Sequence, residues 1–450
     1  MSNVFNIVDF GAVADGATNN APAIQRAIDA ASEAGGRVYI PAGKFLSGTL
    51  RLKSNIDFHL SAKACLMGSL NESDISGFEA LRGDAKLKWD GGCFLFAKDE
   101  SNITISGQGT ICGQGEKVFF EDNADGGLRE CPLNFKILFR PRTTFFENIT
   151  NLTVRDITVR DAARWTLHMA GCTYVNVDGI KIFNNIRGAN NDGIDCDCCK
   201  HVTVSNCIVE TGDDAVVVKS MEAMTRLYGG SENIIVRGCI LASRDSAIKI
   251  GTETHGNIRN ITVSDCIVRD CSRGIGIWAR DGAVVEGIHI HHITGAVRKY
   301  AGCNRPKGLP GHWWGQGEPI FINATHRNSE LRYPGAIRDI HIDHICLKAE
   351  SSVFVAGEEC SVINNVSITD MDITLCRQGT QEHGSFDEQP SPRGIYPHSI
   401  PVVYGRYVNN LYVRGRVRYE SPYNEKENMI SEFKNCSGAS SEVTVVRQEE

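Results

Sequence analysis

The chain has 450 residues, of which 42% are hydrophobic and 22% charged, and its formal net charge is -7. No basic stripe offsets this acidic balance, so we expect no nucleic acid among its partners. No apolar run approaches the length of a membrane span, so we expect no membrane insertion. The first residues lack a charged leader followed by an apolar core, which predicts a cytoplasmic protein unless a signal has been trimmed.

The first 45 residues are predicted to form an N-terminal cap. Phe5 to Gly11 has the pattern of a strand and turn. Asn20 to Ala34 predicts a helix with Asn20 as its N-cap, Pro22 in its first turn and Gly35 as its stop. We expect this helix to cover the open end of a repeating core, because solenoids need such caps.

A repeat of short apolar runs follows, each alternating β-branched and polar residues. The runs end at Val154, Val177, Val204, Val236, Val263, Ile290 and Ile342. Val204 to Val236 spans 32 residues and Val236 to Val263 spans 27, which is the length of one solenoid coil. Alternation with period two indicates strands, and hairpin dipeptides are missing between them. The sequence therefore predicts an all-β chain, a single right-handed parallel β-helix over residues 1–450.

Two acidic segments fall at equivalent points of neighbouring coils. Asp192 ends one coil, and Asp213 and Asp214 end the next. Counting ten residues on from Val204, Val236 and Val263 reaches Asp214, Ser246 and Arg273, which we therefore expect at equivalent points of successive coils. In register, Asp192 and Asp214 would lie roughly 4.8 Å apart. Asp213 precedes Asp214, so we expect its side chain to point elsewhere. Crowded carboxylates raise the pKa of one another and suit acid and base chemistry, although Asp and Asn are also common turn residues.

The 17 cysteines do not predict a disulfide framework. Cys207, Cys239 and Cys266 each lie three residues after the end of a run, which predicts a ladder of free thiols packed in the core. Cys196, Cys198 and Cys199 lack a second Cys or His pair at zinc spacing. We therefore expect a reducing compartment, no metal ion and no cofactor.

Two long insertions interrupt the later coils. Residues 302–318 are rich in Gly and Pro and contain Trp313 and Trp314, and residues 378–398 form a second polar insertion. Insertions between coils commonly build the walls of a groove, so we expect both to line one. The tryptophans could stack on sugar faces there, although a lone Trp is buried by default.

The chain resembles a known family. The segment from Phe10 to Gly16, the helix after it, Asn190-Asn191-Asp192-Gly193-Ile194-Asp195 and Gly212-Asp213-Asp214 together are similar to glycoside hydrolase family 28, the polygalacturonase and rhamnogalacturonase family. The resemblance extends from about Val4 to Asn364. It implies a right-handed parallel β-helix and hydrolysis with inversion, with Asp213 matching the general acid and Asp192 and Asp214 the carboxylates that activate water.

Other parts of the family pattern are replaced. Galacturonan hydrolases carry Gly-His-Gly and Arg-Ile-Lys on the next two coils, where this chain has Asp245-Ser246-Ala247 and Gly276-Ile277-Trp278. Nearby lysines or arginines could hold a uronate instead, or could be solvated surface charges. Our candidates for substrate binding are His168, Asp195, Lys219, Lys249, Glu253, Arg273, Trp278 and Arg280, and His255 could contact hydroxyls.

Three functions remain open from the sequence. The first is a glycoside hydrolase acting on a galacturonate- or rhamnose-containing oligosaccharide, for which long walls would suit exo action. The second is a polysaccharide lyase or epimerase, which uses a Lys or Arg base on the same fold. The third is a non-catalytic β-helix that binds carbohydrate. The sequence does not indicate the oligomeric state.

Overall fold

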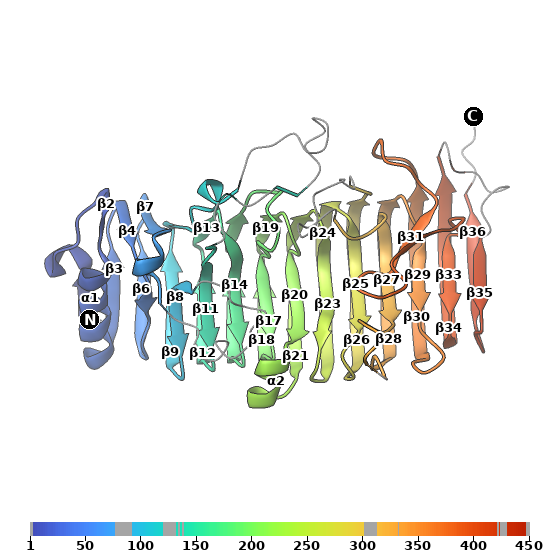
Figure 1. Ribbon diagram of the computed structural model, residues 1–450, viewed down its shortest axis with the longest axis horizontal. Helices are drawn as coiled ribbons and strands as arrows, with labels where there is room; N and C mark the ends of the chain where they lie inside the picture. Colours follow the sequence, from blue (N-terminus) through green and yellow to red (C-terminus); the bar gives the residue numbers. More distant parts are fainter. Residues whose placement is uncertain are drawn as a thin grey trace.

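The computed structural model describes residues 3–76, 92–119, 132–133, 136, 139–300, 313–331, 333–420, 423 and 430–446. Strands stack side by side along the whole length of an elongated molecule, with the N-terminal helix at one end (Figure 1). Every pairing between named strands is parallel, except that between β31 (Ser385–Asp387) and β32 (Ile395–Pro397). The predicted right-handed parallel β-helix is confirmed.

Two parallel sheets form the walls of the helix. The 12-stranded sheet consists of β5 (Leu50–Arg51), β8 (Cys93–Lys98), β11 (Arg142–Glu147), β14 (Arg164–Ala170), β17 (Ile194–Asp197), β20 (Val216–Ser220), β23 (Ser246–Thr254), β25 (Arg273–Ala279), β27 (Glu318–Ala324), β29 (Val353–Ala356), β33 (Val403–Arg406) and β35 (Ser431–Lys434). This sheet carries the candidate site.

The 22-stranded sheet supplies the remaining walls. It consists of β1 (Asn3–Asn6), β2 (Asp15–Asn19), β3 (Gly36–Ile40), β4 (Gly43–Ser47), β6 (Ile56–Leu60), β7 (Ala64–Gly68), β9 (Ser101–Gly107), β10 (Thr110–Cys112), β12 (Thr150–Arg155), β13 (Thr158–Arg160), β15 (Thr173–Asp178), β16 (Lys181–Phe183), β18 (Lys200–Ser205), β19 (Ile208–Thr211), β21 (Ser231–Arg237), β22 (Ile240–Ser243), β24 (Ile258–Cys271), β26 (Val284–Val297), β28 (Ala336–Ala349), β30 (Ile363–Leu375), β34 (Val408–Tyr419) and β36 (Ser440–Val445).

The repeat found in the sequence is a column of buried side chains. All seven residues that end its apolar runs pair in one register, from Val154 with Val177 to Ile290 with Ile342. Each of them is at most 1% exposed. Burying one aliphatic side chain contributes about 1.5–3 kcal/mol, so a shift by one residue would move the whole column to the outside. Register is therefore fixed by the core.

Asparagines hold the turns between sheets. Asn102 and Asn148 both have positive φ angles, of 57° and 55°. The side chain of Asn102 donates to Asn55 at 3.0 Å, and Asn151 donates to Asn102 at 2.8 Å. Asparagine tolerates the left-handed region and hydrogen-bonds locally. These ladders repeat the same turn from coil to coil.

The cysteine ladder is confirmed as packing. Cys207, Cys239 and Cys266 are free, and each is 1% exposed. Their thiols donate to the carbonyls of residues two positions earlier, at 3.1–3.3 Å. Cys196 and Cys199 face the main core, whereas Cys198 belongs to a separate apolar cluster beside Met224. The three cysteines therefore do not converge on one point.

The N-terminal cap corrects one detail of the prediction. Helix α1 spans Ala21–Ala34 with Pro at its start, as expected, but Asn20 makes no side-chain cap bond to it. Instead, the buried Asn20 amide accepts from Val13 N and donates to the carbonyls of Val13, Thr18 and Leu46 at 2.8–3.1 Å. It ties the cap to the first coils. The predicted strand and turn are β1 followed by the 3-10 helix η1 (Ile7–Phe10).

The other helices in the described residues are short: α2 (Glu222–Tyr228), η2 (Glu72–Asp74) and η4 (Gly115–Lys117). In the described residues, no helix is both long and apolar enough to cross a membrane.

We expect Asn20→Ala to lower the free energy of unfolding by at least about 2 kcal/mol, because backbone groups buried around residue 20 lose their partners. Urea unfolding followed by circular dichroism measures the change. The exposed Asn3→Ala is the control and should change stability by less than about 0.5 kcal/mol. Equal losses of stability in both variants would contradict the conclusion that Asn20 links the cap to the first coils.

Candidate functional site

The candidate site lies where the turns of two coils enter the 12-stranded sheet. Asp192 precedes β17 and Asp214 precedes β20, and Ile194 pairs with Val216. Gly193 N donates to Asp214 O at 2.8 Å, so the two turns stack as predicted. Arg273 pairs with Ser246, which confirms the register predicted for the next two coils.

All three aspartates converge. Asp192, Asp213 and Asp214 each offer a carboxylate oxygen within 4.8 Å of the other two. The expectation that Asp213 points elsewhere is wrong, because the chain turns sharply between β19 and β20 and does not run as an extended strand. Two backbone N–H groups fix its carboxylate: Asn190 N donates at 2.8 Å and Asp214 N at 3.0 Å.

Asn191 locks the sharp turn that presents Asp213. Its side-chain oxygen accepts from Thr211 Oγ1 at 3.0 Å, Gly212 N at 2.9 Å and Asp213 N at 3.2 Å. At Gly212, a Cβ would lie 2.4 Å from the carbonyl oxygen of Gly188, so only glycine fits there. The Asn-Asp and Gly-Asp-Asp segments are therefore one interlocked unit.

Two buried lysines compensate the acidic cluster. Lys249 Nζ lies 2.5 Å from Asp214, and Lys219 Nζ lies 2.5 Å from Asp195. Burial alone would lower the pKa of Lys249, but the charges of Asp214 and Asp245 raise it. The pKa of Lys219 is likewise raised, by Asp195 and Asp192, against the effect of burial. Both side chains are therefore ammonium ions that hold carboxylates, and neither is a base.

Three other carboxyl groups of the cluster, those of Asp213, Asp192 and Asp245, bind protons more tightly than usual. Burial and then the charge of Asp214 raise the pKa of Asp213 to about 6. Burial also raises the pKa of Asp192, reinforced by Asp213, and that of Asp245, reinforced by Asp214. Because these groups interact, the cluster shares its protons. It holds both protonated and charged carboxyls near neutral pH.

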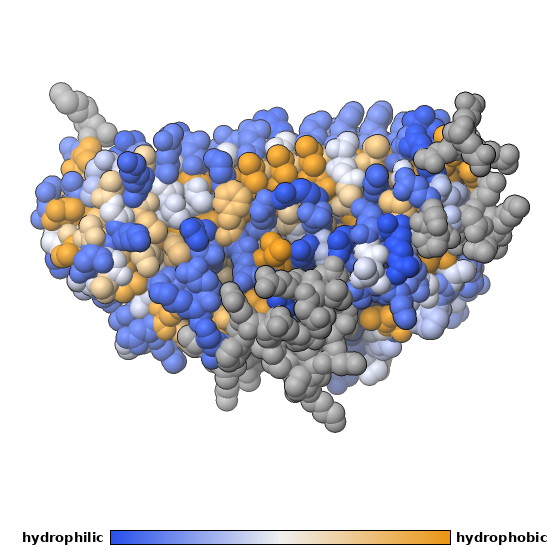
Figure 2. Space-filling model, turned by 90° about the horizontal axis from the view of Figure 1, so that it is seen from above, coloured by the Kyte–Doolittle hydropathy of each residue, from blue (hydrophilic) through white to orange (hydrophobic). Residues whose placement is uncertain are grey.

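A cavity of about 380 Å³ opens over this cluster. Its lining in the described residues is Pro132, Trp165, Ala189, Asn190, Asp192, Asp213, Asp214, Val217, Lys219, Asp245, Lys249, Thr252, Glu253, Trp313, Trp314, Arg327 and Gln389. The face seen from above is mostly polar, with apolar side chains in patches (Figure 2). The cavity therefore combines acidic, basic and aromatic groups.

Aromatic side chains close the outer face of the sheet beyond the cavity. Trp278, Phe321, Phe354 and Tyr404, from β25 to β33, pack with Phe386 of the second insertion. The Trp278 ring fills the space beside Gly276, where a Cβ would meet it at 2.2 Å. On the other side stands Trp165, with Lys219 Nζ 3.7 Å from its ring centre. Within the described residues, these aromatic side chains therefore cover the outer face of β25, β27, β29 and β33.

The structure separates the predicted binding residues into two groups. Lys219, Lys249 and Glu253 line the cavity, and their contact with substrate stays a prediction. Five others are 0% exposed and absent from its lining, and their contact with substrate also stays a prediction: His168, Asp195, Arg273, Trp278 and Arg280. Their outward positions on the sheet suggested exposure, but neighbouring side chains and the second insertion cover them. His255 lies in a different hollow, beside Gly256 and Asn257.

The buried residues support the cavity from below. His168 packs edge-on against Trp165, at 4.9 Å between ring centres, and burial lowers its pKa well below the usual value. Arg280 donates to the carbonyls of Asn323 at 3.0 Å and Pro390 at 2.9 Å. It therefore fixes the second insertion to the sheet.

The insertions contribute as expected where they are described. Trp313 and Trp314 of the first and Gln389 of the second line the cavity. Residues 302–312 of the first insertion lie outside the described residues. Glu388 anchors the second: Arg406 donates to both of its carboxylate oxygens at 2.8 Å. The single-domain interpretation stays a prediction.

Sequence reasoning missed several cavity residues. Trp165 stands in the same Trp-x-x-His segment as His168, of which the sequence predicts only His168 as a binding residue. The sequence shows Asp245 only as a departure from the family pattern. No sequence motif points to Arg327, because it follows β27, which lies a full coil beyond the predicted motifs. Among the described residues, two groups could hold a metal ion: the three aspartates, and His326 with Glu358 and Cys360.

Comparison with known proteins places this arrangement in a family. A model of glycosyl hydrolases family 28 matches residues 32–299, more than half of the chain. The chain belongs to glycosyl hydrolases family 28. A probable polygalacturonase of Vitis vinifera is 28% identical over 310 residues, which cover 66% of this chain and 61% of that protein. An exo-poly-alpha-D-galacturonosidase of Dickeya chrysanthemi is 24% identical, covering 63% and 53%.

Solved structures agree on the fold of this family 28 member. An exopolygalacturonase from Thermotoga maritima has a TM-score of 0.67 at 23% identity, covering 83% of this chain and 88% of that one. A family 28 exopolygalacturonase of Yersinia enterocolitica has a TM-score of 0.61 at 18% identity, covering 100% and 79%. The chain spans about three-fifths of the length of the Vitis relative.

The raised pKa of Asp213 predicts how stability changes with pH. Between its ordinary value of 3.8 and about 6, the folded protein keeps a proton that the unfolded chain has lost, so stability falls as pH rises through this window. Asp213→Asn removes this effect. We expect the variant to be more stable than the wild type at about pH 7.5, by up to about 2 kcal/mol, and no more stable at about pH 4.

Urea unfolding at both pH values measures this difference. Asp178→Asn is the matched control, because hydrogen bonds from Ser205 and Asn206 lower the pKa of Asp178. That variant should lose stability near neutral pH. A stability gain for Asp213→Asn that is the same at both pH values would refute the conclusion that burial and neighbouring carboxylates raise the pKa of Asp213.

Proposed function

We propose that the protein hydrolyses glycosidic bonds in a pectin-type oligosaccharide that contains galacturonate or rhamnose. The observation that carries the proposal is the convergence of Asp192, Asp213 and Asp214 at the base of one cavity. Glycosidases work with carboxyl groups of unequal proton affinity, one to protonate the leaving oxygen and one to activate water. Membership of family 28 supports the same chemistry.

Asp213 is the general acid in this proposal. It is the most exposed of the three aspartates, since Asp192 and Asp214 are only 6% and 2% exposed. Its pKa of about 6 lets it carry a proton under mildly acidic conditions and release it to the leaving group. The two backbone N–H groups on its carboxylate favour the charged form that remains after the transfer.

Asp214 and Asp192 then bind and activate the attacking water molecule. Lys249 Nζ lies 2.5 Å from Asp214 Oδ2, and a carboxylate paired in this way suits the role of the base. One oxygen of Asp192, Oδ1, is buried without a hydrogen-bond partner and can accept from a water molecule. A water held between these two aspartates would attack the anomeric carbon while Asp213 protonates the leaving oxygen.

Inversion is part of the proposal, on the strength of the family. Inverting pairs usually lie about 6.5–9.5 Å apart, whereas the nearest oxygens here lie within 4.8 Å. The spacing of these carboxylates is therefore shorter than that of most inverting pairs. It fits a water that is held within the carboxylate cluster instead of in a wide gap between acid and base.

A lyase or epimerase is disfavoured by the same contacts. Such enzymes need a neutral Lys or another base beside a uronate carboxylate. The raised pKa values of Lys219 and Lys249 keep both protonated, and each is already bound to an aspartate. A non-catalytic binding protein would not need three buried carboxyl groups with unequal proton affinity.

The cavity also favours a short stretch of substrate. Because Trp278 and its aromatic neighbours fill the outer face beyond β23, a polymer could not lie along the sheet in both directions. This closure supports exo action. Arg327, whose side chain is 27% exposed and pairs with Asp281, is the cation we propose for a uronate carboxylate. We further propose a reducing, cytoplasmic setting, which the free core thiols would tolerate.

We expect the wild-type protein to release monomers or dimers from pectin-derived oligosaccharides, with new reducing ends and no ultraviolet absorbance. Asp213→Asn should lower kcat by at least about 100-fold with little change in KM, because proton transfer by a positioned acid contributes about that factor or more. Reducing-end assays and nuclear magnetic resonance of the first product anomer measure both properties.

Asp178→Asn, a change of the same chemistry outside the cavity lining, serves as the control and should keep full activity. Unsaturated, ultraviolet-absorbing products would establish a lyase and overturn the proposal. A retained anomeric configuration would overturn inversion alone, and early release of long internal fragments would overturn exo action.

A further inference from the structure

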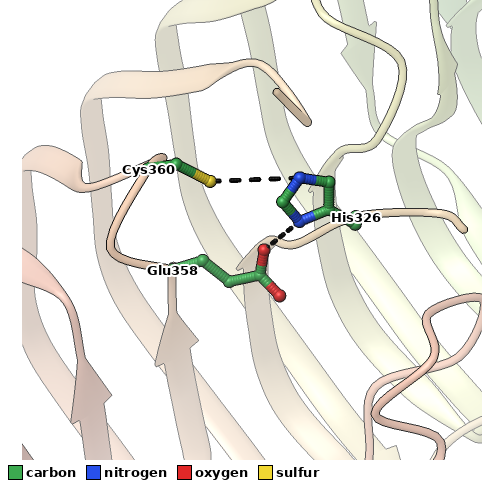
Figure 3. A group of neighbouring side chains, drawn as sticks. All are labelled: His326, Glu358 and Cys360. Atoms are coloured by element: carbon green, nitrogen blue, oxygen red, sulfur yellow. Dashed lines mark hydrogen bonds and ion pairs between the residues drawn. The ribbon is translucent and has the colours of Figure 1, made fainter. Parts of the chain in front are cut away.

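Three side chains of different chemistry meet on neighbouring coils, outside the cavity lining. His326 comes two residues after the end of β27, and Glu358 and Cys360 lie in the turn after β29. Strands β27 and β29 pair in parallel, with Asn323 opposite Ala356, so the two turns stack. Figure 3 shows the imidazole, the carboxylate and the thiol facing one another across a small gap.

The contacts within this group are close. Glu358 hydrogen-bonds to His326 Nδ1, and Cys360 Sγ lies 4.0 Å from His326 Nε2. One ligand atom from each residue lies within 4.8 Å of the other two. His326 and Glu358 are partly buried, with side chains 23% and 18% exposed, whereas Cys360 is exposed to solvent. An ion from solution can therefore reach the group.

We propose that His326, Glu358 and Cys360 bind one zinc ion. Zinc takes imidazole nitrogen, thiolate sulfur and carboxylate oxygen at about 2.0–2.3 Å. In a tetrahedral site these ligand atoms lie roughly 3.3–3.8 Å from one another. With Nε2 as the ligand nitrogen, it and Cys360 Sγ, which lie 4.0 Å apart, need to approach by a few tenths of an ångström, and the Glu358 carboxylate needs to leave Nδ1 and turn toward the Nε2 side. Water completes the fourth position.

The backbone around the three ligands is already held in place. Ser361 N donates to Glu358 O at 2.9 Å, and Glu358 N donates to Ser361 O at 3.3 Å, which closes the turn that carries Glu358 and Cys360. On the other coil, Arg327 follows His326 and donates twice to Asp281, at 2.6 and 2.8 Å. Little ordering remains for the ion to impose, which favours binding.

The charges also match a divalent ion. Thiolate and carboxylate together supply two negative charges, and His326 binds as the neutral imidazole. Zinc coordinates the thiolate form of cysteine, so its binding displaces the thiol proton of Cys360. Zinc affinity should accordingly rise with pH. Because Arg327 lines the catalytic cavity, the ion would also fasten the segment that carries it.

The test uses the full chain after removal of metal with a chelator. We expect calorimetry to show one zinc ion per chain, and cobalt to give an intense thiolate-to-metal absorption band. Cys360→Ser should abolish the band and weaken zinc binding by at least about 10-fold. Cys346→Ser, which changes another exposed cysteine, on β28, should keep both.

Several results would overturn the site. These are a wild-type protein without the cobalt band, equal losses in the Cys346→Ser and Cys360→Ser variants, or unchanged zinc affinity in His326→Gln. Loss of zinc binding in Asp213→Asn would place the ion among the catalytic carboxylates instead. Thermal unfolding in chelator should be alike for the two serine variants, which excludes misfolding as the cause of a difference.

Discussion

Parallel stacking at one fixed register is the constraint on which the rest of this structure depends. Each coil repeats the backbone of the one before it, so a residue placed at a turn in one coil lies one strand spacing from its counterpart in the next. Asp192 and Asp214 meet for this reason alone, since 22 residues separate them in the chain and Ile194 pairs with Val216. The column of buried aliphatic residues from Val154 to Ile342 makes any other register costly. Core packing thereby positions the chemistry.

The site is built by balancing charges that the fold has brought together. Five acidic residues line the cavity, Asp192, Asp213, Asp214, Asp245 and Glu253, against the three cations Lys219, Lys249 and Arg327. Burial alone would raise the pKa of Glu253, but Lys219, Arg327 and Lys249 lower it, so it stays charged. Burial and then the charge of Asp214 raise the pKa of Asp213 to about 6. One cavity thus holds carboxyl groups in both protonation states, which is the condition for acid and base to act together.

The fold and the aspartate cluster could be predicted from the sequence because both depend on periodicity. Alternation gave the strands, and counting along the coils gave the register that Ser246 and Arg273 confirm. The residues that border the cavity could not be predicted in this way. Whether an outward side chain such as Trp278 is exposed depends on the second insertion folded over it, and no local pattern encodes that cover. Asp213 was misplaced because a turn does not follow the alternation of a strand, and Asn191 bends the chain there.

The central claim is that burial and neighbouring charges keep a proton on Asp213 into the range where the reaction runs. The pH dependence of kcat/KM on a pectin-derived oligosaccharide tests this claim most directly, because it reports the essential groups of the free enzyme. Since the acid must be protonated, kcat/KM should fall tenfold per pH unit above an apparent pKa near 6. A profile that stays flat from about pH 5 to pH 8 would contradict the account, because an acid with that pKa would be unprotonated over most of this range.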